Sequence, residues 1–229
     1  MLREKNTFYC FSPEVMLATF VIEMILAAYT FMRYRMTSFG MVASAILVML
    51  ATFQVAEYQI CAGDGGLLWA RIGMIAITIL PILGLHLILL INNTEKLLKA
   101  VYFVAIISVI FFALLPVAIT DSVCGGNYVI FKSDLAQFFR IYSLYYFGLL
   151  FLGIWKTYEL ITINKEAPHR RRTLYWVFFG YLSFILPTAI IYGFYESTLS
   201  GTASIMCGFA VIFALILALR VVPLYHQKD

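Results

Sequence analysis

Long apolar stretches alternate with short polar segments along the whole chain. A helix that crosses a membrane needs about 20 mostly apolar residues, and seven stretches meet that length. They cover residues 13–32, 38–60, 67–91, 97–119, 136–159, 173–194 and 201–221. The pattern therefore predicts an all-α polytopic membrane protein, with residues 1–229 forming a single seven-transmembrane-helix domain.

Composition supports this reading and excludes others. Of the 229 residues, 63% are hydrophobic and 12% are charged, and the mean hydropathy is +0.92. The surface of a water-soluble domain of this size needs more charge. Short connections leave no room for a separate catalytic or nucleic-acid-binding domain. We therefore expect an integral membrane protein whose surroundings are membrane lipid, with no nucleic-acid partner.

Basic residues are distributed unevenly between the two sides of the predicted bundle. One side would hold eleven lysines and arginines: Arg33, Arg35, Lys96, Lys99, Lys156, Lys165, Arg170, Arg171, Arg172, Arg220 and Lys228. The other side would hold five: Arg3, Lys5, Arg71, Lys132 and Arg140. Because cytoplasmic loops are enriched in lysine and arginine, this asymmetry predicts an outside N-terminus and an inside C-terminus.

Three prolines fall inside predicted spans. Pro81, Pro116 and Pro187 lie in the third, fourth and sixth spans, each directly after a leucine. A proline frees a backbone carbonyl that lipid cannot satisfy, so these positions predict kinks that face protein or water.

The cysteines predict an outer disulfide. Cys10, Cys61 and Cys124 all fall in segments placed outside, where thiols tend to pair. Glycine-containing turns follow Cys61 and Cys124, which favours a bridge between these two. Pairing of Cys10 with either one, or no bridge at all, stays open, because sequence does not fix connectivity. No CxxC motif or neighbouring histidine indicates a metal site, and we expect no cofactor.

Charged and polar residues inside the spans are candidates for function. Glu23 lies about 15 Å into the first span, where an ionisable group needs a proton or a partner. A functional interior position and a neutral, hydrogen-bonded glutamate are equally supported. Gln54 and Glu57 share one helix face, and Arg71 lies at the same outer level. An ion pair of Glu57 with Arg71 that clamps two helices is favoured over a ligand contact.

Further polar residues widen this outer group. Arg140, Tyr145 and Tyr192 lie in the outer halves of the fifth and sixth spans. Together they predict a vestibule for a small molecule, and an ordinary interfacial belt of tyrosines is the competing interpretation. His86 lies about 28 Å along the third span, near the inner boundary. A packed, hydrogen-bonded histidine is the common case there, and coupling to the inner side is the functional one.

Several activities are disfavoured. His86, His169 and His226 are the only histidines, and they are too scattered for a three-histidine metal site or a haem. The last span has no lysine for a retinal Schiff base. No set of nucleophile, base and orienting group is visible, so we expect no enzyme.

The stretch ATFQVAEYQIC and the following WARIGMIAITILPILGLHLILLI carry a resemblance. They are similar to the seven-transmembrane sensor regions at the N-termini of some bacterial histidine kinases, and CGGNYVIF at residues 124–131 also looks similar. The matching positions are Phe53, Gln54, Glu57, Trp69, Arg71, Gly73, Leu80, Pro81, Gly84 and His86. The resemblance implies a sensor in a bacterial inner (plasma) membrane. With G-protein-coupled receptors the chain shares only topology, since their acidic-Arg-aromatic triplet and their Asn before the last proline are missing.

We therefore expect a stand-alone, receptor-like membrane sensor. No kinase or cyclase segment follows Asp229, so a small or lipophilic ligand bound from the outer side would signal to a separate membrane or cytoplasmic partner. One alternative is a transporter or channel for a small solute that uses an intramembrane glutamate. A second is a non-catalytic assembly subunit of a membrane complex.

Overall fold

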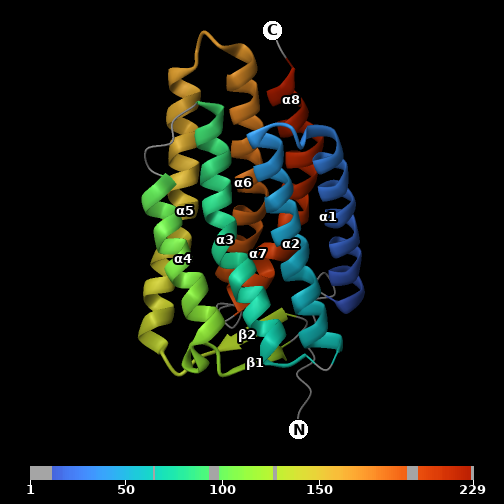
Figure 1. The fold of residues 1–229 in the computed structure, drawn as a ribbon, viewed down its shortest axis with the longest axis vertical. Coiled ribbons are helices and arrows are strands. Elements are labelled where there is room, and N and C mark those ends of the chain that lie inside the picture. The colour runs from blue at the N-terminus through green and yellow to red at the C-terminus, as the bar shows by residue number, and fades with distance from the viewer. Residues whose placement is uncertain (1–11, 64, 93–97, 126–127, 195–200, 228–229) are drawn as a thin grey trace.

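A bundle of seven helices forms the protein (Figure 1). The computed structural model describes residues 12–63, 65–92, 98–125, 128–194 and 201–227, without the side chains of residues 136–139. Its helices are α1 Pro13–Tyr34, α2 Ser38–Ala62, α3 Leu67–Ile91, α4 Leu98–Leu114, α5 Ala136–Ile163, α6 Pro168–Phe194 and α7 Thr202–Ile216. The last rod continues through the π-helical turn η4 Leu217–Val221 into the short α8 Val222–His226.

Within the described residues, five helices are long and apolar enough to cross a membrane. They are α1, α2, α3, α6 and the continuous rod Thr202–His226. The apolar helix α4 is shorter, with 17 residues. The chain is therefore an all-α integral membrane protein with several candidate spans.

Several helix boundaries differ from the sequence-based prediction, and two of them lie at prolines. The fourth helix ends at Leu114 instead of continuing to residue 119, and Pro116–Ala118 form the 3-10 turn η2. A residue before proline is pushed out of the helical region, and Leu115 accordingly has ψ 120°. Pro116 therefore ends a helix where a kink was expected. In contrast, α6 begins at Pro168, because proline fits the first turn of a helix.

A two-stranded antiparallel ribbon, absent from the sequence-based prediction, follows α4. It pairs β1 Asp121–Gly125 with β2 Tyr128–Lys132, and Val123 lies opposite Ile130. The ribbon lies at the end of the bundle opposite α8 (Figure 1). The signal for it was present in the run of β-branched and aromatic residues 128–131 after a glycine-rich turn.

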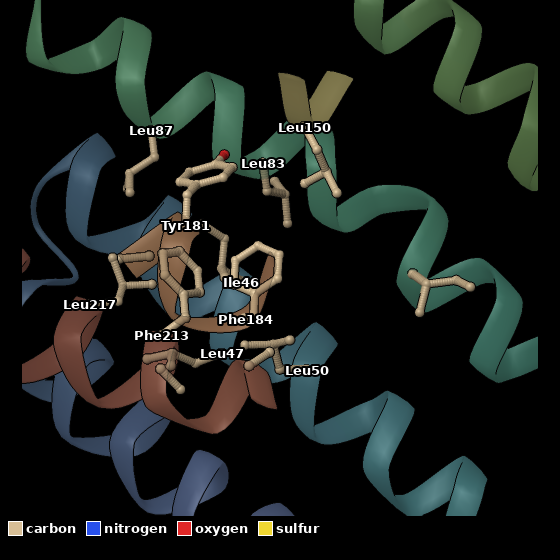
Figure 2. Close-up of a cluster of buried hydrophobic side chains, with 14 of the residues drawn as sticks. Ile46, Leu47, Leu50, Leu83, Leu87, Leu150, Tyr181, Phe184, Phe213 and Leu217 are labelled. Carbon is tan, nitrogen blue, oxygen red and sulfur yellow. The ribbon is translucent and has the colours of Figure 1, made fainter. Parts of the chain in front are cut away.

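The core lies where α2, α3, α6 and α7 meet. Ile46 and Leu47 of α2, Leu83 and Leu87 of α3, and Phe213 and Leu217 of the last rod are buried there. Figure 2 shows the Tyr181 ring of α6 among these side chains, with its hydroxyl oxygen directed at α3.

The C-terminal α8 closes the end of this core at the α1–α2 turn. Thr37 Oγ1, in the turn between α1 and α2, lies 2.9 Å from His226 Nε2. The rings of Phe39 and Tyr225 stack with centroids 3.8 Å apart. These contacts hold α8 against the α1–α2 turn.

Candidate functional site

A small cavity lies inside the bundle at the kink of α3. Its volume is about 40 Å³, and five helices contribute to it: α2, α3, α5, α6 and α7. Pro81 and Gly84 of α3 form part of the wall, and Phe184 and Ala210 face them from α6 and α7. The polar side chains in the wall are Tyr146, Tyr181 and Cys207. A phenol both donates and accepts hydrogen bonds, so the cavity combines apolar walls with polar groups of the kind that orient small ligands.

Two glycines make room for the Tyr181 hydroxyl. A Cβ atom at Gly84 of α3 would clash with this oxygen, and one at Gly153 of α5 would lie 3.0 Å from it. Tyr181 is 3% exposed, so its ring reaches from α6 across the core to the α3–α5 contact. Any larger side chain at position 84 would displace the hydroxyl from the cavity wall.

Hydrogen bonds from α5 hold the kinked part of α3. Tyr145 Oη donates to the carbonyl oxygen of Thr78, one turn before Pro81, at 2.9 Å. Tyr142 Oη lies 3.0 Å from Thr78 Oγ1, which itself donates to the Met74 carbonyl oxygen at 2.6 Å. The carbonyl that Pro81 itself leaves without an N–H donor is that of Ile77, four residues earlier, so these bonds hold the residue next to it. We call these three residues, Thr78, Tyr142 and Tyr145, the α3–α5 latch.

A larger groove of about 320 Å³ runs between α5 and α6 beside the cavity. Phe147, Phe151 and Ile185 line it, and Tyr192 lies at its outer part. Leu150 and Met206 belong to the walls of both spaces, so these two side chains separate the groove from the cavity. Phe151 is 67% exposed, which shows that this groove opens on the outer surface of the bundle.

A polar group lies between α1, α2 and α7. Glu23 is fully buried, and neither of its carboxylate oxygens has a hydrogen-bond partner among the described residues. Glu57 is also buried and is hydrogen-bonded by the Ser204 hydroxyl. Gln54 Nε2 donates to the Cys207 carbonyl oxygen at 3.0 Å. These contacts attach α7 to α2 close to the cavity.

Glu57 and Arg71 do not form the expected ion pair. Arg71 Nη1 donates instead to the Ala113 carbonyl oxygen of α4 at 3.1 Å. The Glu57 carboxyl group is hydrogen-bonded by Ser204. A carbonyl near a helix end has no partner within its own helix, so it accepts from an arginine on the neighbouring helix. Each residue therefore holds two helices together, but not the expected pair: Arg71 joins α3 to α4, and Glu57 joins α2 to α7.

The other predicted site residues are separated. His86 Nδ1 of α3 lies 2.7 Å from Tyr102 Oη of α4, so His86 contributes to the α3–α4 contact. Arg140 is exposed near the start of α5. Of the predicted vestibule residues, Tyr192 lines the groove between α5 and α6. The cavity is lined by Tyr146 and Tyr181, which were not among the predicted site residues, and by Leu80 and Gly84, which had been named only as positions of the resemblance.

The end of the bundle that carries the ribbon, predicted to be the outer one, is covered and covalently tied. A disulfide joins Cys61 of α2 to Cys124 of β1, as the sequence predicted. Tyr128 of β2 is buried with Ile205 of α7, and Val129 N donates to Ser204 Oγ at 3.1 Å. The ribbon therefore lies over α7, where an open vestibule was expected. Cys10 and its pairing lie outside the described residues.

The fold and these spaces define a class: a polytopic α-helical membrane protein with a small internal cavity and an apolar groove on its surface. Among the described residues, no three histidine, cysteine or acidic side chains gather as metal ligands. No protein-family model, curated protein or solved structure matches the chain.

Proposed function

We propose that the protein is a stand-alone, receptor-like sensor of seven transmembrane helices that binds a small lipophilic ligand and signals to a separate partner. The basic-residue asymmetry supports an outside N-terminus and an inside C-terminus. The resemblance of the second and third helices to bacterial sensor regions supports a bacterial inner membrane. The cavity at the Pro81 kink, directly beside the α3–α5 latch, is the observation that carries the proposal.

A ligand in this cavity would bias two packings of the kinked helix. At about 40 Å³ the cavity accommodates only a few water-sized groups. A larger ligand would therefore separate Pro81 from α5 or α7 and strain the Tyr145–Thr78 hydrogen bond. A ligand changes the equilibrium between two states only if it fits one of them better. Because the cavity is small in the packing described, a larger ligand would fit the more open packing better.

The groove between α5 and α6 is the proposed route. The ribbon covers α7 at the outer end, whereas Leu150 and Met206 alone divide the cavity from the groove. The ligand would lie in the outer half of the bilayer with its apolar body in the groove. A single polar group would pass the two side chains and reach the hydroxyls of Tyr146 and Tyr181.

The proposed output is the hairpin of α5 and α6. These helices extend beyond α1, α2 and α3 at the end where α8 lies (Figure 1). Their connection carries Lys165 and is followed by Arg170, Arg171 and Arg172. A shift of α5 at the latch would move this basic end relative to a partner on the inner side.

Filling the cavity tests the proposal. Ala210→Leu adds bulk to the α7 wall, and Ala28→Leu is the matched control on the exposed face of α1. Both variants and the wild type would be purified from bacterial membranes, and the small molecules extracted from them would be compared by mass spectrometry. We expect a lipophilic compound that the wild type and Ala28→Leu retain and Ala210→Leu loses. Identical extracts from all three proteins would contradict ligand binding in this cavity.

A proton-linked transporter is the second candidate, and Glu23 is the observation that favours it. A buried carboxyl without a hydrogen-bond partner among the described residues is an unusual feature in a membrane helix. Solute uptake into liposomes driven by a proton gradient, and abolished by Glu23→Gln, would favour transport over sensing. Uptake that is absent in the wild type would exclude it for the solutes assayed.

A further inference from the structure

A second groove lies along the seam of α5 and α6, at the end of the bundle near α8. Its volume is about 290 Å³. Tyr158 and Ile161 of α5 and Phe178 of α6 form an apolar side, and Lys165 and Arg171 lie at the other side. A groove with an apolar wall and a cationic rim has the amphipathic character of a phospholipid.

The Arg171 side chain is held in place, but its charge is not neutralised by protein. Its Nη2 donates to Tyr175 Oη at 3.2 Å, and its guanidinium carbon lies 5.5 Å from the centre of that ring. The Nε atom is buried and has no hydrogen-bond acceptor among the described residues. A guanidinium group that is held by a neutral phenol, and that forms no ion pair within the described residues, keeps its charge and is suited to a phosphate.

Neighbouring acidic groups do not neutralise this end of the seam. Glu159 is paired with Lys156, whose Nζ lies 2.7 Å from Glu159 Oε2. Glu166 is exposed in the connection after Lys165, and the structure gives it no ion pair within its described part. With Arg170 and Arg172 also present, the positive charges outnumber the single unpaired carboxylate.

The level of the groove fits a headgroup. Trp155 and Tyr158 are 58% and 61% exposed, and aromatic side chains of this kind favour the boundary between headgroups and acyl chains. Lys156 lies between them and is paired with Glu159, and further basic residues follow from Lys165 onward. The apolar part of the groove therefore lies at acyl-chain depth and its cationic part at phosphate depth.

We propose that this groove binds an anionic phospholipid, with its phosphate on Arg171 and Lys165 and an acyl chain along Ile161 and Phe178. The proposal requires only that the chain crosses a membrane, and it is independent of any ligand in the central cavity. A bound lipid contacts α5 and α6 together, so it stabilises one spacing of their protruding ends. Anionic lipid would thereby set the resting position of this hairpin.

Native mass spectrometry tests the site with dioleoylphosphatidylglycerol, dioleoylphosphatidylcholine and inorganic phosphate as probes. For the wild type we expect the anionic lipid to bind more tightly than the zwitterionic one. Arg171→Gln should lower affinity for the anionic lipid about fivefold, the effect of about 1 kcal/mol for one basic residue. Arg171→Lys should restore most of this loss, and the exposed neighbour in Arg170→Gln is the matched control that should leave affinity unchanged.

Three results would overturn the proposal. Equal affinity for the two lipids would mean that the groove is merely apolar. An equal loss in Arg170→Gln and Arg171→Gln would indicate diffuse attraction by the basic segment. Inorganic phosphate that displaces the lipid at equal concentration would identify a site for free phosphate. Melting temperatures of the variants in phosphatidylcholine, unchanged from the wild type, would establish that each one is folded.

Discussion

The two sides of the bundle are constructed differently. On the side of α1, α2 and α7 the helices are tied at both ends, by the Cys61–Cys124 disulfide and ribbon at one and by Thr37 with His226 at the other. On the side of α5 and α6 the seam contains two grooves, of about 320 and 290 Å³. The first side is a scaffold, and the second offers space that a ligand or a lipid can occupy.

The two sides of the bundle also differ in what their polar side chains contact. On the scaffold side, buried polar groups such as Gln54 and Ser204 are used to join helices. On the seam side, the polar side chains of Tyr192 and Arg171 line the two grooves. Elements that respond to ligands are usually among the less stable parts of a protein. We therefore expect the side of α1, α2 and α7 to determine stability and the side of α5 and α6 to respond to ligands.

Removing the disulfide should have the largest effect on stability. Cys61 and Cys124 are 63 residues apart in sequence, and opening such a loop increases the freedom of the unfolded chain. We expect the double variant Cys61→Ser, Cys124→Ser to lose about 2–4 kcal/mol in the free energy of unfolding. Chemical denaturation in detergent measures this, and a reductant should destabilise only the wild type. An unchanged midpoint would mean that the scaffold does not depend on its covalent tie.

Glu23→Leu should stabilise the protein. Both carboxylate oxygens of Glu23 are buried without a hydrogen-bond partner among the described residues, and replacing such a group by an apolar one of similar size removes its desolvation penalty. The expected gain is about 1–3 kcal/mol, measured by denaturation as above. Met24→Leu, on the adjacent exposed position, is the matched control. A large loss of stability would show that Glu23 has a partner that the scaffold needs.

Tyr145→Phe should weaken the seam side by a smaller amount. It removes the hydrogen bond to the Thr78 carbonyl but keeps the ring, so the expected cost is about 1 kcal/mol. Tyr29→Phe, which changes an exposed tyrosine of α1, should have no effect. Hydrogen exchange should in addition show faster exchange in α3 near Pro81. Faster exchange in α1 and α2 instead would contradict the separation of the two sides.

The ion pair of Asp121 with Lys132 should matter least. The hydrogen bond from Lys132 lowers the pKa of Asp121 below its ordinary value of 3.8, and both side chains are more than half exposed. A lowered pKa means that the pair stabilises the ribbon above pH 3.8 and that this contribution is lost as the pH falls through the folded-state value. Because exposed pairs contribute little, Asp121→Asn should melt close to the wild type at pH 7. A clear difference there would make the ribbon a larger part of the scaffold.

Much of the fold was predictable from local pattern. Apolar runs of about 20 residues specify membrane helices, and the starts of α1, α2 and α3 agree with the predicted spans to the residue. The disulfide also followed from placing Cys61 and Cys124 on one side. Helix ends were less predictable: Pro116 ended α4, and the basic residues after Pro168 belong to α6.

The candidate functional site could be predicted from local sequence pattern only in part. Tyr145 and Tyr192 were named from their outer position, but their neighbours Thr78 and Met206 come from other helices. Glu57 and Arg71 were expected at the same level of the bundle, but each forms a hydrogen bond with a different residue. A depth along a helix gives no information about which face meets which neighbour.

By itself, the sequence determined that the chain belongs in a membrane, which segments are helical, and that Cys61 can meet Cys124. Hydropathy and proline act on the residues next to them, so these properties are local. The tertiary structure alone decided that Tyr181 lies between Gly84 and Gly153, that a ribbon covers α7, and that the α5–α6 seam stays open. Each of these depends on the rotation and crossing of helices far apart in sequence, which side-chain packing sets only when all of them are assembled.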